Sequence, residues 1–511
     1  MKRRFLAAAI AAALALSAPV NAPALDTEVE SFDGTDIVTH FYPASGLGPG
    51  DKAPTILIGH GWGGTGEGAD GSPAPFLAEG YNVLTWDARG FGGSGGTVMI
   101  DHPKFEAKDV SALIDFVAER PEAKLEKPGD PLLGMSGGSY GGGIQFITAA
   151  RDRRVDVISP TIPWHNLLES LYPKKSTKAG WDLALIGVGI PTSVALGVFN
   201  ASGIETGNQS EEFYNAVIGG LGTGQIPEEE VDWFEEHGPD FLLEKIRVPT
   251  MIAQGTVDTL FDLNQGHRNY LALKRNDIPL KMMWFCGGHG VCNVDADGSG
   301  ALADSELVQK RRLQWFDRYL KGNRKTRTGP PFEWIDQNGE WHGSPGGYPL
   351  KHAGHLKGTS EGGPIPLAPG TNPTSGFLIL ASPDPTAPVT VPFESEGGEE
   401  VVGAPTLRFT YSATGLSTTR TDGLTHIYGQ IVDLERNVVV GNQSTPIPIK
   451  LDGEDHTIRA SLTRIANVAP GAGFELQLVS QSNLFDAQRA TGLVSISDLE
   501  ARLPVTKPRK R

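Results

Sequence analysis

The sequence predicts an α/β core that is interrupted by a helical insertion and followed by a C-terminal all-β domain. From about residue 54, short apolar runs alternate with glycine turns and helical stretches, which is typical of a mostly parallel sheet flanked by helices. Residues 166–245 show no strand alternation, and the runs after about residue 374 are β-type and separated by turns. With 511 residues, the chain is also longer than one hydrophobic core supports.

Residues 1–24 are predicted to be a cleaved signal peptide. Lys2, Arg3 and Arg4 precede the apolar run FLAAAIAAALALSA, which is shorter than a membrane span, and an A-x-A-like site ends the segment. The arginine pair hints at twin-arginine export, but it lacks a good surrounding consensus, so the general secretory route is favoured. We therefore expect a secreted or periplasmic protein with no membrane contact after cleavage.

The balance of charges excludes one class of partner. Removal of the three basic residues of the signal peptide takes the formal net charge from −16 to −19. An acidic surface repels phosphate backbones, and no basic patch with interleaved aromatic residues occurs in the sequence. Nucleic acid is therefore not expected to bind. The sequence gives no indication of the oligomeric state.

Residues 25–165 and 246–325 are predicted to form the two parts of the α/β core. Strands are expected in APTILIGHG, YNVLTW, PLLGMSG and VDVISPT before the insertion, and in VPTMIAQG and IPLKMMWFC after it. Helices are expected in EAKDVSALIDFVAERPE and SELVQKRRLQWFDRYLKG. An insertion as long as residues 166–245 is either a lid or a small cap domain.

Residues 326–373 are predicted to be a linker, because much of the segment is rich in Gly and Pro and lacks periodicity. Residues 374–511 contain the runs TLRFTYSAT, HIYGQIVDLERNVVV, HTIRASLTRI and GFELQLVS between turns. This spacing indicates an antiparallel β-sandwich or jelly roll.

The stretch GMSGGSYGGG contains two overlapping G-x-S-x-G patterns, centred on Ser136 and Ser139. In α/β-hydrolases the nucleophile lies on a sharp turn between a strand and a helix. If Ser136 were the nucleophile, the strand would shrink to PLL and the helix would begin through several glycines, each costing about 0.5–1 kcal/mol relative to Ala. Ser139 allows a full strand and a helix through GGIQFITAA, so Ser139 is predicted to be the nucleophile.

Ser139 needs a histidine to take its proton and a carboxylate to orient that histidine, and in this fold the chain order is Ser, Asp, His. Asp258 follows the strand in VPTMIAQGTVD, and His289 follows the strand in MMWFCGGHG. Both lie where an α/β sheet presents its active-site loops. Residues of the same types without this placement are Asp262, His237 and His267. The predicted catalytic residues are therefore Ser139, Asp258 and His289.

The oxyanion of an acyl-transfer intermediate needs N–H donors. One is expected from the backbone of Tyr140, which follows the nucleophile, and the other from the backbone of Trp62 in the loop HGWGG. The Trp62 indole is expected to pack or to line a substrate pocket, and His60 to hold the loop.

With these motifs, the chain resembles the CocE/NonD hydrolase family, which includes cocaine esterase and the Xaa-Pro dipeptidyl-peptidases. The resemblance rests on GGSYGGG, on GTVDTLF around Asp258, on GGHG around His289, and on the order of core, insertion and β domain across nearly the whole mature chain. It implies acyl transfer to serine from an ester, or from an amide after proline, followed by hydrolysis without an organic cofactor. It also implies a C-terminal jelly-roll domain of the galactose-binding-like kind. Cocaine esterase-like members use a tyrosine hydroxyl in the oxyanion hole where this chain has Trp62.

The segment DADGSGALADSE has the ligand spacing of a calcium loop. The expected ligands are Asp295, Asp297, Ser299, the carbonyl of Ala301, and Glu306. The alternative is a solvated acidic loop that caps the next helix. A structural calcium ion is the favoured interpretation, because calcium prefers oxygen ligands and the loop offers them in sequence order. Since the loop starts six residues after His289, a bound ion would stiffen the loop that presents this histidine.

The chain has only two cysteines, Cys286 and Cys292, and they bracket His289. In an exported protein they can pair if their Cα atoms lie within about 7 Å. The alternative is one buried and one exposed free thiol. A disulfide is predicted.

These observations favour a serine esterase that acts on a small-molecule ester or peptide. An Xaa-Pro dipeptidyl-peptidase would also need acidic groups for the free amine of its substrate, for which Glu169, Glu211 and Glu212 in the insertion are nominated. The alternative from another class is a non-catalytic binding protein on a hydrolase fold. None of the residues needed for catalysis is missing from the sequence, so the enzyme is favoured.

Overall fold

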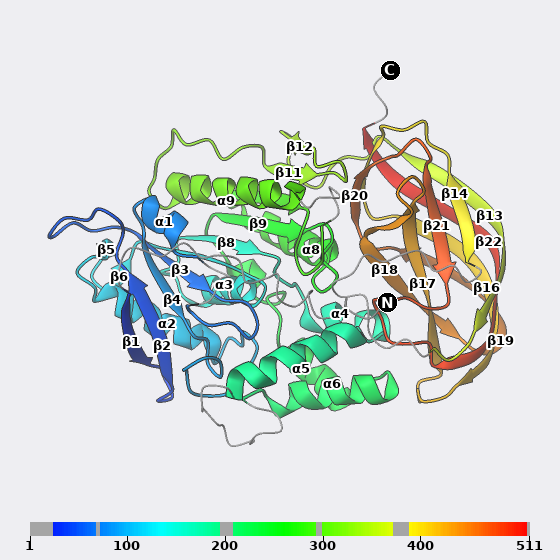
Figure 1. The fold of residues 1–511 in the computed structure, drawn as a ribbon, viewed down its shortest axis with the longest axis horizontal. Coiled ribbons are helices and arrows are strands. Elements are labelled where there is room, and N and C mark those ends of the chain that lie inside the picture. Colours follow the sequence, from blue (N-terminus) through cyan, green and yellow to red (C-terminus); the bar gives the residue numbers. More distant parts are fainter. Residues whose placement is uncertain (1–23, 68–71, 195–207, 293–298, 371–387, 508–511) are drawn as a thin grey trace, which may run out of the picture.

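The computed structural model describes residues 24–67, 72–194, 208–292, 299–370 and 388–507. The predicted signal peptide thus lies outside the described residues except for its last position. Figure 1 shows an α/β part built around one large sheet and an all-β part beside it. Within the described residues, no helix has the length and apolar character needed to cross a membrane.

The α/β part is organised around a ten-stranded sheet. Its strands are β1 (Leu25–Glu30), β2 (Asp36–Tyr42), β3 (Thr55–Gly59), β4 (Asn82–Trp86), β7 (Leu133–Gly138), β8 (Val157–Thr161), β9 (Thr250–Gly255), β10 (Leu280–Phe285), β11 (Phe332–Ile335) and β12 (Trp341–Ser344). Their order in space is β1-β2-β4-β3-β7-β8-β9-β10-β11-β12. Neighbours from β4 to β11 pair in parallel, and the outer pairs β1/β2, β2/β4 and β11/β12 are antiparallel.

Helices cover both faces of this sheet. Successive residues of a strand point to opposite faces, so one strand contributes apolar side chains to both cores. On β3, Ile56 and Ile58 pack in one core with Phe316, whereas Leu57 packs in the other. The first face is covered by α1 (Ala74–Ala78) and α9 (Ser299–Tyr319). The second is covered by α2 (Glu106–Ala118), α3 (Tyr140–Arg151) and α8 (Leu263–Leu273). A small hairpin of β5 (Leu125–Lys127) and β6 (Asp130–Pro131) lies apart from the sheet, and η4 (Lys274–Asn276) follows α8.

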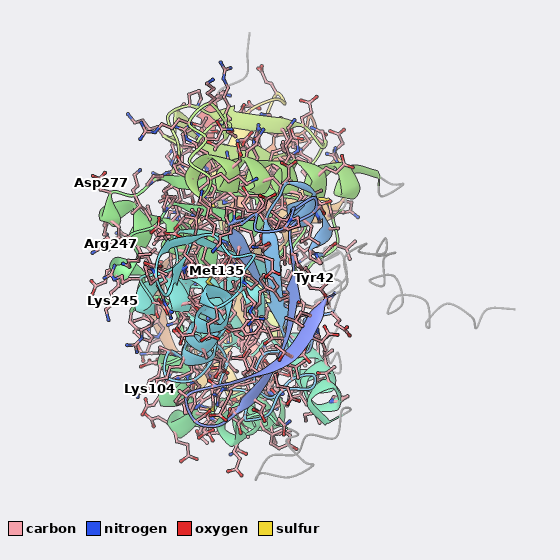
Figure 2. The ribbon with its side chains drawn as sticks, turned by 90° about the vertical axis from the view of Figure 1, so that its left-hand side faces the viewer. Tyr42, Lys104, Met135, Lys245, Arg247 and Asp277 are labelled. Atoms are coloured by element: carbon pink, nitrogen blue, oxygen red, sulfur yellow. A yellow bond between two sulfur atoms is a disulfide. The ribbon has the colours of Figure 1, made fainter. Side chains whose placement is uncertain are left out.

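The central strand β7 leads directly into the candidate site. Met135 on this strand is fully buried and lies in the middle of the ribbon in Figure 2, whereas Lys104, Arg247 and Asp277 lie at its periphery. A strand buried on both faces is typical of parallel sheets. The end of β7 is therefore held in a fixed position by the core.

The elements described in the insertion between β8 and β9 are all helical, apart from an isolated β-bridge between Gln209 and Val98. They are α4 (Leu167–Leu171), η2 (Pro173–Lys175), α5 (Ala179–Val194), α6 (Glu211–Thr223), α7 (Glu228–Glu235) and η3 (Leu243–Lys245). Ser210 caps α6 by accepting a hydrogen bond from the Phe213 N–H, and α6 buries Phe213 and Val217. Figure 1 shows α5 and α6 side by side along one side of the α/β part.

The segment 326–373 differs from the linker that the sequence predicts. Strands β11 and β12 extend the α/β sheet, and β13 (Gly354–Leu367) pairs antiparallel with β22 (Ala490–Lys507) of the all-β part. The Gly and Pro residues of β13 conceal a strand whose residues alternate between exposed and partly buried positions. This segment is therefore built into the two sheets that it connects.

The all-β part is a sandwich of two sheets, as the predicted fold class requires. Its remaining strands are β14 (Val389–Phe393), β15 (Glu400–Gly403), β16 (Thr406–Ser417), β17 (Leu424–Asp433), β18 (Val438–Lys450), β19 (Asp452–Ser461), β20 (Ile465–Val468) and β21 (Phe474–Val479). One sheet has the order β19-β16-β22-β15-β20 with β13 also on β22, and the other has the order β14-β21-β17-β18. Phe409, Ile427 and Leu476 pack in one hydrophobic core between the sheets.

Candidate active site

Ser139 occupies the sharp turn between β7 and α3. Its backbone has φ 55° and ψ −117°, a conformation that costs a non-glycine residue energy and is typical of functional sites. Close approach of the backbone requires the flanking glycines, because a Cβ at Gly137 would lie 2.5 Å from the carbonyl oxygen of Gly59 and one at Gly141 would overlap the same carbonyl. Ser136 is buried within β7, below the turn.

His289 connects Ser139 to Asp258. Its Nε2 lies 2.7 Å from the Ser139 hydroxyl oxygen, and its Nδ1 lies 2.8 Å from Oδ2 of Asp258. The other carboxylate oxygen of Asp258, Oδ1, accepts hydrogen bonds from the N–H groups of Leu260 and Phe261, at 3.0 and 2.7 Å. Asp258 is fully buried, so its charge can stabilise a protonated His289 without competition from water.

The sheet explains why three residues so far apart in the sequence meet. Strands β7, β9 and β10 are parallel members of one sheet, so their carboxyl ends lie at the same edge. Asp258 and His289 each follow one of these ends by a few residues. Gly288 permits their contact, because its backbone has φ 101° and a Cβ there would lie 2.6 Å from the Asp258 carboxylate.

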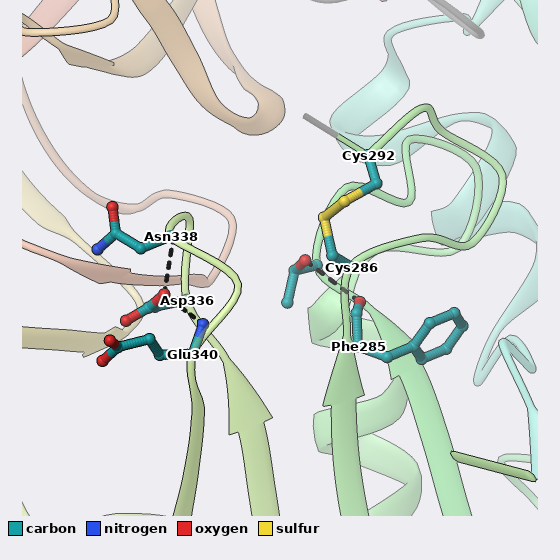
Figure 3. Close-up of a disulfide and its surroundings, with 7 residues drawn as sticks. Phe285, Cys286, Cys292, Asp336, Asn338 and Glu340 are labelled. Carbon is teal, nitrogen blue, oxygen red and sulfur yellow. Dashed lines mark hydrogen bonds between the residues drawn. A yellow bond between two sulfur atoms is a disulfide. The ribbon is translucent and has the colours of Figure 1, made fainter. Parts of the chain in front are cut away.

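The predicted disulfide between Cys286 and Cys292 is present. Its Cα atoms are 5.4 Å apart, and the bridge closes the loop that carries His289 (Figure 3). Both cysteines pack in a small apolar cluster with Val257 and Ile335, beside the end of β11. The bridge therefore ties the loop at its two ends while leaving His289 free to face Ser139.

A cavity of about 450 Å³ opens beside Ser139 and His289. The other residues that line it come from the turn at Ser139, from helix α5 and from the loops that follow β3, β8, β9 and β10. They are Gly61, Trp62, Gly138, Ile162, Trp181, Ala184, Leu185, Val188, Leu260 and Gly288. The ring of His289 lies edge-on to Trp181 and Phe261, at centroid distances of 5.7 and 5.1 Å. The site is thus enclosed by apolar groups, and the cap helix supplies one wall.

The loop predicted to supply an oxyanion donor is fixed by side-chain contacts. The Trp62 indole N–H donates to the carbonyl of Leu185 on α5 at 2.9 Å, so the indole ties the loop to the cap. His60 accepts the Ala88 N–H at Nε2 and donates from Nδ1 to the Gly61 carbonyl at 2.7 Å. Tyr140 is the first residue of α3, where a backbone N–H has no partner within the helix.

The other aspartate and histidines considered for catalysis, and the glutamates nominated for a peptidase, do not join Ser139. Asp262 caps α8 by accepting the N–H groups of Asn264 and Gln265. His267 binds the Tyr348 hydroxyl at 2.6 Å, and His237 stacks on Trp233. The three nominated glutamates, Glu169, Glu211 and Glu212, do not line the cavity beside Ser139.

A buried acidic cluster, which the sequence does not reveal, lies near the turn that carries Ser139. Arg89 forms a bidentate pair with Asp109, both contacts at 2.7 Å, and the Tyr140 hydroxyl donates to Glu106 at 3.4 Å. Burial and the nearby Asp109 raise the pKa of Glu106 to about 7. Burial and Glu106 also raise the pKa of Asp101 well above its usual range. No local motif marks this cluster, since its members come from separate loops and α2.

The all-β part also contacts the site, at a place that the sequence does not reveal. The Gln443 side chain on β18 donates to the backbone carbonyl of Asp258 at 2.7 Å. A polar residue within a strand gives no sequence signal of such a contact across 185 positions.

The predicted calcium segment is only partly described. Asp295 and Asp297 lie outside the described residues, while Ser299 and Ala301 lie in the first turn of α9 and Glu306 is exposed on the same helix. An EF-hand places its helix after the twelve-residue loop, whereas α9 begins at the fifth position. The helical start does not fit an EF-hand loop, and calcium binding stays a prediction from the sequence.

Comparisons with known proteins identify the family of the chain and its fold. The sequence profile of the X-Pro dipeptidyl-peptidase (S15) family matches residues 33–290. Three solved structures share the fold over nearly the whole chain. A CocE/NonD family hydrolase from Staphylococcus aureus is 12% identical with a TM-score of 0.65, covering 97% of this chain and 99% of its own. An α-amino acid ester hydrolase is 15% identical with a TM-score of 0.64, covering 98% and 100%.

The third structure is an aminopeptidase from the marine sediment archaeon Thaumarchaeota archaeon, 13% identical with a TM-score of 0.66, covering 97% of this chain and 98% of its own. No curated protein sequence matches the chain. The profile match covers just over half of the 511 residues. The chain therefore belongs to the X-Pro dipeptidyl-peptidase (S15) family and is a serine hydrolase with the fold of the CocE/NonD hydrolases.

Proposed function

We propose that the protein is an exported esterase that forms an acyl-enzyme on Ser139. The observation that carries this proposal is the position of His289, with Nε2 2.7 Å from the Ser139 hydroxyl and Nδ1 2.8 Å from Asp258. A serine hydroxyl becomes a good nucleophile only when a positioned base removes its proton. The two contacts supply the base and the group that orients it.

In the first half of the reaction, Ser139 Oγ attacks the ester carbonyl while His289 Nε2 takes the hydroxyl proton. The buried Asp258 carboxylate holds the Nδ1 proton and stabilises the imidazolium that forms. The negative charge on the carbonyl oxygen is met by the backbone N–H groups of Tyr140 and Trp62. His289 then protonates the leaving alcohol.

In the second half, a water molecule takes the place of the alcohol. His289 removes a proton from this water, which attacks the acyl carbonyl, and the same two N–H groups stabilise the second oxyanion. The proton returns to Ser139 as the carboxylic acid leaves. Removal of one oxyanion donor from such a site costs about 10²–10³ in kcat.

The cavity beside Ser139 favours an uncharged, apolar acyl or alcohol group. None of the described residues that line it carries a carboxylate, and Trp181, Leu185 and Val188 from α5 form an apolar wall. An Xaa-Pro dipeptidyl-peptidase must hold the protonated amine of its substrate, and a desolvated amine without a counter-charge is costly. An ester substrate is therefore the main proposal, and a post-proline peptide, which the family suggests, is the second.

The test is labelling of the purified mature protein with a fluorophosphonate, followed by location of the adduct by peptide mass spectrometry. Ser139 is expected to carry the label, and Ser139→Ala is expected to remove it. Ser136→Ala is the matched control, because Ser136 lies in the same glycine-rich stretch but is buried in β7. Absence of labelling in a folded protein would instead favour a non-catalytic binding protein.

A labelled protein is then compared on p-nitrophenyl butyrate and on glycyl-prolyl p-nitroanilide. For each substrate, kcat/KM is divided by the rate constant of the uncatalysed hydrolysis. A ratio at least about a hundredfold higher for the ester supports the esterase. A preference for the anilide would assign the peptidase activity.

We also propose export and, as a structural cofactor, calcium. Export is supported by the signal-like N-terminus and by the disulfide, because disulfides persist mainly in oxidising compartments. Calcium is supported only by the ligand spacing from Asp295 to Glu306, and no step of the reaction depends on it.

A further inference from the structure

A second and larger cavity, of about 580 Å³, lies where the cap, the α/β core and the β-sandwich meet. The cap contributes η2 and the residues before α5, the core contributes the start of α8, and the sandwich contributes β18, β19 and the loop between β19 and β20. It does not contain Ser139 or His289. We refer to it as the junction cavity.

The junction cavity is positively charged within a protein whose formal net charge is −16. Five cationic side chains line it and only two carboxylates, Glu169 and Asp262, oppose them. The cationic residues are Lys174, Lys178, Arg268, Arg459 and Arg464. Like charges gathered in one cavity repel each other and attract an anion.

Several polar groups in the cavity lack an ion-pair or a hydrogen-bond partner among the described residues. Arg464 donates to the Asn264 side chain at 2.6 Å, and among the described residues no carboxylate forms an ion pair with it. The described part of the chain offers the Lys174 ammonium no hydrogen-bond partner. Ser444 is 4% exposed, and none of the described residues forms a hydrogen bond with its hydroxyl.

Arg464 is partly removed from water. Burial lowers its pKa below the usual value, although Asp262 and the Tyr348 hydroxyl act in the opposite direction. Arg268 differs, since it pairs with Glu169. A bound anion would give the Arg464 guanidinium an ion-pair partner and the exposed Lys174 ammonium a hydrogen-bond partner.

The rest of the wall is apolar. Ile447, Leu462, Leu484 and Phe485 line the same cavity. Ile447 and Leu462 are almost completely buried. The cavity therefore combines a cationic region with an apolar region, and it suits a molecule with both kinds of surface.

We propose that the junction cavity is a second ligand site, for a small organic carboxylate that carries an apolar group. The carboxylate lies against the cationic part of the wall, which contains Arg464 and Lys174, and the apolar group lies against the part that contains Leu462 and Phe485. This proposal does not depend on the reaction at Ser139.

One residue gives this site a route to the catalytic residues. Leu260 lines both cavities, its N–H donates to Asp258 Oδ1, and its carbonyl accepts from the Lys178 ammonium at 2.9 Å. A ligand in the junction cavity therefore contacts the loop that carries Asp258. This one consequence rests on the proposed esterase function: its products are carboxylic acids, so binding in the junction cavity would couple product concentration to the loop that carries Asp258.

The test uses 4-fluorobenzoate as the probe and ¹⁹F NMR titration of the full mature chain. Saturable binding is expected, and Arg464→Gln and Lys174→Gln are each expected to weaken it about tenfold, as loss of a charge-assisted hydrogen bond does. Arg502→Gln, an exposed arginine on β22 outside the cavity, is the matched control and should bind normally. Val188→Trp, which fills the cavity beside Ser139, should also leave binding unchanged.

Neutral 4-fluorobenzamide and inorganic phosphate complete the test. Binding of 4-fluorobenzamide as tight as that of 4-fluorobenzoate would overturn the role of the cations, and equally tight binding of phosphate would overturn the role of the apolar wall. Loss of binding in Val188→Trp with normal binding in Arg464→Gln and Lys174→Gln would place the probe beside Ser139 and overturn the proposal. Because the Lys174 side chain is exposed and its ammonium has no hydrogen-bond partner in the described part of the chain, its variant keeps the test valid even if Arg464→Gln unfolds.

Discussion

Asp258→Asn is expected to lower kcat by about four orders of magnitude because the structure fixes the orientation of the new amide. Oδ1 of Asp258 accepts two backbone N–H groups, from Leu260 and Phe261, and only the carbonyl oxygen of asparagine can replace it. The amide NH₂ then takes the place of Oδ2 and faces Nδ1 of His289. An N–H donor at this place requires an unprotonated Nδ1, so the proton moves to Nε2.

A proton on Nε2 prevents His289 from taking the proton of Ser139. The same substitution in a Ser-His-Asp protease costs about 10⁴ in kcat for this reason, which is about 5 kcal/mol of transition-state stabilisation. Substrate contacts in the cavity beside Ser139 do not involve Asp258, so KM is expected to change little.

The assay is steady-state hydrolysis of p-nitrophenyl butyrate, with circular dichroism to establish that each variant is folded. Asp336→Asn is the matched control, since Asp336 is also buried and lies 2.9 Å from a histidine, His342, away from Ser139. The control should retain kcat within a few-fold. A folded Asp258→Asn variant with kcat within tenfold of the native protein would refute the assigned role of Asp258.

Three further predictions concern stability. Replacing Cys286 and Cys292 by serine should lower the free energy of unfolding by about 2 kcal/mol, measured in urea, and reduce kcat through a looser His289 loop; unchanged values would contradict the role of the bridge. Burial opposes protonation of His342, but hydrogen bonds to Asp336 and Glu400 outweigh it and raise its pKa to about 9, so its stabilisation is complete below pH 6.5 and lost as the pH rises through 9. The cost of His342→Gln should therefore be up to about 3 kcal/mol greater at pH 6 than at pH 10, and an equal cost at both would count against the ion pairs. If calcium binds, chelation should lower the melting temperature, and re-added calcium should restore it. For calcium at a hundredfold excess over its Kd, the lost stability is about 2.7 kcal/mol. A melting temperature unaffected by either step would exclude the site.

The parts of the fold that the sequence predicted best are those with a repeating local pattern. The buried strands before Ser139, Asp258 and His289 are continuous apolar runs that end in glycine-rich loops, and parallel pairing brings such ends to one edge. The choice of Ser139 over Ser136 depended on the cost of glycine in a helix start, which is also a local property. Ser139, Asp258 and His289 could be proposed from the sequence because the order of residues along the chain and the glycine-rich loops at the strand ends are enough to select them.

The features that the sequence did not predict depend on contacts between distant segments. Strand β13 is rich in Gly and Pro, and it is recognisable only through its pairing with β22. Glu106 faces Tyr140 from another element, and Gln443 reaches Asp258 from the sandwich. The nominated glutamates do not line the cavity beside Ser139, since position in the insertion does not determine which cavity a side chain lines.

The contact from Gln443 to the carbonyl of Asp258 has a consequence for the biosynthesis of the protein. Synthesis proceeds from the N-terminus, so Ser139, Asp258 and His289 all leave the ribosome well before Gln443 does. The loop of Asp258 gains the hydrogen bond from Gln443 only when β18 has folded against it. An incomplete chain thus carries all three residues without the complete support of one of them, and full hydrolytic competence is delayed until the sandwich has docked.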